Sequence, residues 1–146
     1  MILRSPSLIA GLVALPLILG QCDNAADRAE QHFLTAVNLV EAGDPDRAVV
    51  ELRNVFRLDG QHRDARATYA RLMRERGNLR EAYGHYLRLV EQYPEDLEAR
   101  LALGEMALAS ADWTEAERHI RQAEAVAPED PLVRTMLATL EYRNAL

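Results

Sequence analysis

Lysine is absent from this 146-residue sequence, cysteine occurs once, and aromatic residues make up only 5% of the chain. A single cysteine excludes an internal disulfide, so Cys22 is a free thiol, an intermolecular link or a modified residue. The shortage of aromatic and β-branched residues disfavours strands, whereas abundant alanine, leucine, arginine and glutamate favour helices. The net charge of −6 makes nucleic-acid binding an unfavourable hypothesis.

Sequence motifs for catalysis or metal binding are also lacking. His85 and His119 lie 34 residues apart, and no HxxxH pattern or Cys/His cluster occurs. No glycine-rich phosphate loop is present, and no serine or cysteine stands in a motif that would supply a catalytic base. We therefore expect a protein that is not an enzyme and has no cofactor, no metal site and no small-molecule substrate.

The first 21 residues have the character of a secretory signal. Arg4 precedes an apolar run over residues 8–20. This run is too short to cross a bilayer comfortably, because a spanning helix takes about 20 residues. A positive start followed by a short apolar run is typical of a signal peptide.

The end of this segment, Leu19-Gly20-Gln21-Cys22, resembles a bacterial lipobox, with Gln21 standing where a small residue is usual. The resemblance implies that Cys22 is lipidated and becomes the mature N-terminus, with residues 22–28 as a polar tether. In such lipoproteins an aspartate after the cysteine, here Asp23, favours retention at the inner membrane. An ordinary cleaved signal and an uncleaved anchor remain alternatives in which Cys22 is incidental.

Small and helix-breaking residues recur at an interval of 34 residues through the rest of the chain. The three recurring sets are Ala48, Ala82 and Ala116; Gly43, Gly77 and Ala111; and Gly60, Pro94 and Pro128. A fixed period of this length is typical of stacked helical hairpins, in which each hairpin buries its apolar face against its neighbours. We predict an all-α solenoid with three units over 29–62, 63–96 and 97–130, and a final helix or partial fourth unit over 131–146.

Capping residues support this division of the chain. Asp44, Asp112 and Asp130 stand where they can cap the free amides of a following helix, and Pro45 and Pro131 suit the first helical position. The pair Asn78 and Glu81 predicts a near capping box at the corresponding point of the second unit.

These units resemble the tetratricopeptide repeat. Small residues stand at the middle of each first helix, as that family requires: Ala36, Ala70, Gly104 and Ala138. The large aromatic residue that the family places early in the first helix is replaced here by His32, Arg66 and Arg100. The resemblance covers about residues 29–146 and implies a right-handed superhelix whose concave groove is lined mainly by the first helices. The last helix either caps the array or begins a further unit.

Carrying the family's groove positions onto this sequence gives a candidate partner-binding groove. Its members are Phe33, Val37, Val40, Arg71, Arg74, Leu101, Glu105 and Leu108. Such a surface would hold an extended or helical peptide, with the two arginines binding a carboxylate. The alternative is that the arginines are merely solvated and the apolar residues belong to the core. The lysine–asparagine clamp of chaperone-binding relatives is missing, which disfavours an adaptor for chaperone tails.

Arginine is concentrated in the middle of the chain. Residues 53–88 hold nine arginines and four acidic residues, whereas the sequence on either side has an excess of acidic residues. This basic belt could bind an acidic protein, an anionic polysaccharide or lipid head groups. The alternative is a set of solvated helix faces with internal ion pairs.

The sequence as a whole resembles the tetratricopeptide lipoproteins of exosortase (PEP-CTERM) polysaccharide-export systems. The resemblance rests mainly on the lipobox, the turn Ala42-Gly43-Asp44 and the helix Val50-Glu51-Leu52-Arg53-Asn54. It implies an adaptor for a protein or peptide partner in the cell envelope, lipid-anchored on the periplasmic face of the inner or outer membrane, or soluble in the periplasm. The alternatives are a pilotin-like lipoprotein for pilus or secretin assembly and a regulatory subunit of a periplasmic cell-wall enzyme complex.

Overall fold

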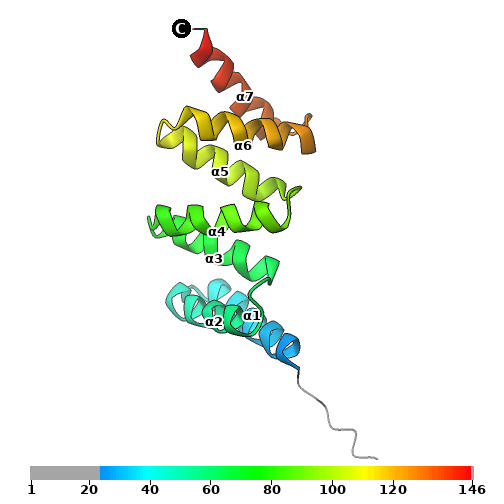
Figure 1. Cartoon of the computed structure of the whole chain (residues 1–146). Coiled ribbons are helices and arrows are strands. Elements are labelled where there is room, and N and C mark those ends of the chain that lie inside the picture. The colour runs from blue at the N-terminus through cyan, green and yellow to red at the C-terminus, as the bar shows by residue number, and fades with distance from the viewer. Residues whose placement is uncertain (1–23, 146) are drawn as a thin grey trace, which may run out of the picture.

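The computed structural model describes residues 24–145, which form seven helices. They are α1 (Ala25–Glu41), α2 (Pro45–Leu58), α3 (Arg63–Glu75), α4 (Leu79–Gln92), α5 (Leu97–Ala109), α6 (Trp113–Val126) and α7 (Pro131–Asn144). Successive helices form antiparallel hairpins that are stacked into an elongated array, with α1 and α2 at one end and α7 at the other (Figure 1). The predicted all-α helical-hairpin solenoid is confirmed. The predicted signal segment and Cys22 lie outside the described residues.

Helix pairing follows the order of the chain. Helix α1 packs mainly against α2, α3 against α4, and α5 against α6, while α4 with α5 and α6 with α7 join neighbouring hairpins. Helix α7 lies against both α5 and α6. None of the helices between residues 24 and 145 has the length and hydropathy of a membrane span.

Most of the predicted caps are present. Asp44 accepts a hydrogen bond from the amide of Arg47, and Asp112 accepts one from the amide of Glu115, each at 3.2 Å. Asp130 accepts from two amides at the start of α7. Such caps satisfy backbone donors that have no partner inside the helix.

The predicted capping box at Asn78 and Glu81 is wrong. The side chain of Asn78 makes no capping hydrogen bond, and its amide lies 3.8 Å from the sulfur of Met73. Glu81 instead accepts a hydrogen bond from the Tyr69 hydroxyl at 2.6 Å. A tertiary contact to the preceding helix therefore takes the carboxylate that the local sequence assigns to the helix start.

The tight turn inside each hairpin requires a left-handed backbone. Gly43 and Gly77 have φ values of 74° and 77°, and Ala111 takes the same place in the third hairpin with φ of 57°. Glycine adopts this conformation without steric cost, whereas an alanine is mildly strained there. The recurring small residue at this position is therefore explained by backbone conformation.

The recurring alanines early in each second helix are explained by close packing. Ala48, Ala82 and Ala116 are fully buried. The small residues of the first helices behave similarly, since Ala36 and Ala70 are fully buried, whereas Ala138 on α7 is exposed. A larger side chain at the buried positions would push neighbouring helices apart.

Arginine replaces the aromatic residue of the family at two buried positions. Arg66 and Arg100 are only 5% and 7% exposed. Each guanidinium donates to the carbonyl oxygen of the residue six positions earlier, Gly60 and Pro94, in the turn between hairpins. The Arg66 guanidinium also lies over the ring of Phe56, 5.4 Å from its centroid. The two arginines therefore fix the turns between hairpins instead of serving as surface charges.

Candidate partner-binding surface

The eight predicted groove residues lie on three first helices. Phe33, Val37 and Val40 are on α1, the two arginines are on α3, and the remaining three residues are on α5. Each of the eight side chains is partly exposed, neither fully buried nor fully free in solvent. Because the helices are equivalent members of successive hairpins, these residues form one face of the array. We call this face the α1/α3/α5 face.

The apolar members of this face contribute to packing as well as to the surface. Phe33 and Val40 rest on the core formed by the first five helices, and the Phe33 ring lies 4.8 Å from the ring of His62. Leu101 and Leu108 rest on the smaller core formed by α5, α6 and α7. Both interpretations of the sequence therefore hold in part, because these residues support the core and remain accessible.

Both arginines of this face already have carboxylate partners. Arg71 pairs with Glu75 one turn along α3 at 3.1 Å, and Arg74 pairs with Glu105 of α5 at 2.9 Å. These side chains are 39% to 55% exposed. Exposed pairs contribute only about 0–1 kcal/mol, so a carboxylate from a partner can exchange with them at little cost.

The basic belt is largely used to join hairpins. Arg76 pairs with Asp46 at 2.6 Å, and Arg63 pairs at 2.8 Å with Asp96, whose carboxylate also caps α5. Arg53 donates to the Tyr69 hydroxyl at 3.1–3.2 Å. The arginine-rich middle of the chain and its acidic flanks are therefore complementary parts of one structure, which supports the ion-pair interpretation of the belt.

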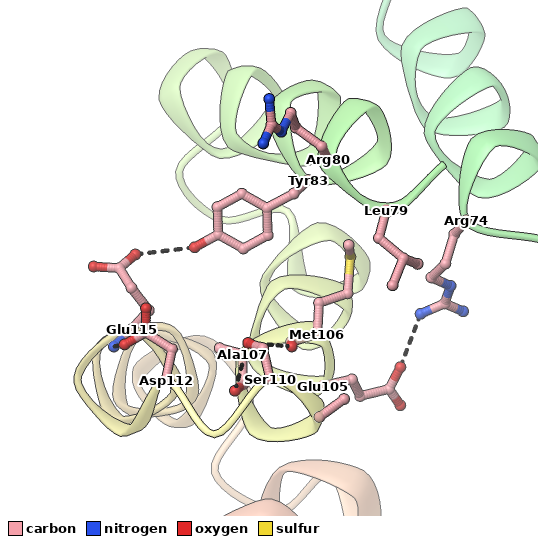
Figure 2. Close-up of a pocket in the computed structure, with 11 residues that line it drawn as sticks. Arg74, Leu79, Arg80, Tyr83, Glu105, Met106, Ala107, Ser110, Asp112 and Glu115 are labelled. Atoms are coloured by element: carbon pink, nitrogen blue, oxygen red, sulfur yellow. Dashed lines mark hydrogen bonds and ion pairs between the residues drawn. The ribbon is translucent and has the colours of Figure 1, made fainter. Parts of the chain in front are cut away.

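A separate pocket of about 670 Å³ opens beside this face, where the tight turns of the second and third hairpins lie next to each other (Figure 2). We call it the turn-edge pocket. Leu79 and Tyr83 of α4 and Met106 and Ala107 of α5 supply its apolar walls. Its polar members are Arg74, Arg80, Glu105, Ser110, Asp112 and Glu115.

A hydrogen-bond network fixes one wall of this pocket. The Tyr83 hydroxyl donates to Glu115 at 3.0 Å, as Figure 2 shows, and Arg118 also donates to Glu115. Burial and the hydrogen bond to Glu115 raise the pKa of Tyr83 to about 12, so this phenol stays a donor. The hydrogen bond from Arg118 is the main reason that the pKa of Glu115 is lowered. This wall is therefore held in one arrangement at neutral pH.

The sequence analysis did not identify the turn-edge pocket. Of its lining residues, only Arg74 and Glu105 belong to the predicted groove. A signal was nevertheless present, because the residues 34 positions earlier than Arg80 and Ser110 are Asp46 and Arg76, which differ from them in charge. Among residues 24–145, no group of three or more histidine, cysteine, aspartate or glutamate side chains is placed to hold a metal ion.

Comparisons with known proteins point to one family. The family model described as tetratricopeptide repeat matches residues 39–85 and 74–140. A comparison with curated protein sequences finds no significant match.

Several solved structures share the fold at low sequence identity. The Arabidopsis OM64 TPR domain matches with a TM-score of 0.72 and 14% identity, covering 82% of this chain and 99% of that domain. The first TPR domain of Spaghetti (RPAP3), bound to the HSP90 peptide SRMEEVD, matches with a TM-score of 0.73 and 13% identity over 86% and 99%. PcrH from Pseudomonas aeruginosa matches with a TM-score of 0.66 and 21% identity over 88% and 98%.

Proposed function

The chain belongs to the tetratricopeptide repeat family, and on this basis we propose that it is a non-catalytic adaptor that binds a segment of a partner protein along the α1/α3/α5 face. The observation that carries the proposal is the continuity of this face. Partly exposed apolar side chains from three successive hairpins flank two arginines whose ion pairs are exposed and exchangeable. An extended or helical peptide fits such a surface.

Two structures with the same fold support a peptide as the partner. The first TPR domain of RPAP3 is bound to an HSP90 peptide, and PcrH is in complex with the chaperone-binding region of PopD. The PcrH complex matches this chain with a TM-score of 0.67 and 22% identity. The fold of this chain is thus one that presents a surface to short segments of other proteins.

We expect a photocrosslinking amino acid at position 37 or 71 to form adducts with the partner in cells, and the same amino acid at position 50 or 57 to form none. Val37 and Arg71 lie on the α1/α3/α5 face, whereas Val50 and Arg57 are exposed on α2. Adducts are detected on gels and identified by mass spectrometry.

A matched pair of variants completes this test. Val37→Glu with Arg71→Glu should reduce partner capture about tenfold, because it adds unpaired negative charge to the face. Val50→Glu with Arg57→Glu makes the same chemical change on α2 and should leave capture unchanged. Adducts from both faces, or equal capture by both variants, would show that the partner binds elsewhere.

The site of action is proposed from the N-terminal sequence. We propose export and lipidation at Cys22, which would hold the array at the periplasmic face of the membrane in an envelope assembly of the polysaccharide-export type. Two or more acyl chains give stable membrane attachment, whereas one chain alone gives marginal binding. The apolar run over residues 8–20 and the lipobox-like sequence before Cys22 support this proposal.

Replacing Cys22 with serine is expected to move most of the protein from the membrane fraction to the soluble or unprocessed fraction. The serine hydroxyl cannot form the thioether that carries the lipid. Cell fractionation with immunoblotting measures the distribution, and metabolic labelling with an alkyne fatty acid measures lipidation directly. Membrane association and labelling that match the unaltered protein would exclude lipid anchoring through this residue.

A further inference from the structure

The turn-edge pocket exists because two equivalent junctions of the array differ in charge. Between the first and second hairpins, Asp46 and Arg76 form an ion pair at 2.6 Å that closes the corresponding edge. Between the second and third hairpins, the residues 34 positions later are Arg80 and Ser110. An arginine and a serine cannot form such a pair, and Ser110 instead donates its hydroxyl to carbonyl oxygens of its own helix at 3.0 and 3.1 Å.

The charged groups around this pocket are used internally, with one exception. Glu105 is paired with Arg74, Glu115 accepts from Arg118 and Tyr83, and Asp112 caps the amide of Glu115 at the start of α6. Arg80 has neither an ion-pair nor a hydrogen-bond partner among residues 24–145, although it lines the pocket. The charge left without a paired group is therefore a cation.

The rest of the pocket is suited to an apolar side chain. Leu79 is 53% exposed, which is high for a leucine, and it faces the pocket with Met106 (Figure 2). The pocket volume of about 670 Å³ lies within the range of sites that bind ligands of peptide or drug size. Because Arg74 and Glu105 belong to both surfaces, the pocket adjoins the α1/α3/α5 face.

We propose that the turn-edge pocket is a second binding site, which takes an acidic peptide segment of the partner. The segment places a large apolar side chain against Leu79 and Met106 and a carboxylate on Arg80. Apolar contact supplies most of the affinity, because an exposed ion pair adds little, and the carboxylate fixes the direction of the segment. This inference rests on the proposed function, since it assigns the partner's chemistry at one end of the same surface.

A double variant that closes the pocket tests this inference. Arg80→Asp with Ser110→Arg copies the Asp46–Arg76 pair into the second junction. The matched control is Asp46→Arg with Arg76→Asp, which reverses the pair at the first junction and leaves the turn-edge pocket unchanged. Arg80→Gln is a third variant, in which one exposed residue loses its charge and the fold is not challenged. Circular dichroism and thermal melting verify the fold of each.

The probes are fluorescein-labelled peptides added to the purified full chain in detergent, with binding measured by fluorescence anisotropy. The test peptide is Gly-Ser-Glu-Leu-Phe-Asp-Glu-Ser-Gly, and the charge-reversed peptide has lysine in place of each acidic residue. We expect the test peptide to bind at least tenfold more tightly than the charge-reversed one. The closing variant and Arg80→Gln should each weaken it at least fivefold, and the control at the first junction should not.

The outcomes separate this inference from the proposed function. If both peptides bind equally, or if the closing variant and Arg80→Gln bind the test peptide as the unaltered chain does, the pocket is not an acidic-peptide site. Binding of anionic phospholipid vesicles that depends on Arg80, without binding of the test peptide, would also overturn it. In each of these cases the proposed function still stands if Val37→Glu with Arg71→Glu abolishes partner capture.

Discussion

Acidification from pH 7 to pH 4 is expected to reduce the free energy of unfolding by on the order of 3 kcal/mol through His119 alone. The His119 side chain is fully buried on α6, and burial is the main reason that its pKa falls from the usual 6.5 to about 4, with Arg118 contributing next. Between these two values the unfolded chain binds a proton that the folded chain does not. Stability is therefore unaffected by this group above pH 6.5 and falls as the pH is lowered toward 4.

The surroundings of His119 explain why the folded protein resists its protonation. A guanidinium nitrogen of Arg118 lies 3.1 Å from Nε2 of the imidazole. An arginine can only donate, so Nε2 must be the accepting nitrogen of a neutral ring. Protonation would place an N–H against this cation, and Glu115 at 3.5 Å offsets the repulsion only in part. The other nitrogen, Nδ1, has no hydrogen-bond partner among the described residues.

Urea unfolding measured at several values between pH 8 and pH 4 tests this expectation. In His119→Leu, the pH dependence should be shallower by about one proton, because the titrating group is removed while an apolar side chain of similar size fills the site. Some acid dependence should remain, since burial also lowers the pKa of His85 to about 4. Identical pH profiles for the variant and the unaltered chain would assign the acid sensitivity to other groups.

The repeat architecture was accessible from the sequence because it depends on local requirements. A left-handed turn demands a small residue near Gly43 and Gly77, and a close approach of helices demands one at Ala48 and its equivalents. Both requirements recur with every hairpin, so the 34-residue interval reveals them without knowledge of tertiary contacts. The helix caps at Asp44 and Asp112 are similarly local.

What the sequence did not predict depends on contacts between hairpins. Glu81 bonds to Tyr69 of the preceding helix instead of completing a cap, and Arg66 turns inward to hold the carbonyl of Gly60. The charge of Arg80 gains its meaning only from comparison with Asp46 at the closed junction. Such contacts involve partners up to about one repeat apart, and a helical pattern alone does not say which of several exposed arginines finds a carboxylate.

Replacing Gly104 with leucine is expected to lower the free energy of unfolding by about 3 kcal/mol and to loosen α7. Gly104 lies on α5 where α6 and α7 approach it. A Cβ atom added there would lie 2.7 Å from Cε of Met136 and 3.0 Å from Cγ1 of Ile120. Alanine should be close to neutral, because the methionine methyl group can move and the helix gains about 1 kcal/mol from losing a glycine.

Gly84 provides a matched control for this substitution. It also lies within a helix, α4, but an added Cβ would meet nothing within 4 Å. Gly84→Leu should therefore stabilise the protein by about 0.5–1 kcal/mol through helix propensity alone. Thermal and urea unfolding of both leucine variants measure the difference, and hydrogen exchange in α7 reports whether that helix is the part released.

The opposite signs expected at the two glycines follow from their places in the array. Position 104 is equivalent to Ala36 and Ala70, where the first helix of a hairpin is fully buried, whereas position 84 is partly exposed on a second helix. Leucine leaves no room for the Ile120 and Met136 side chains, so the strain can be relieved only by moving α7 away from α5. If Gly104→Leu is as stable as Gly84→Leu, small residues at the middle of the first helices are not required by close packing.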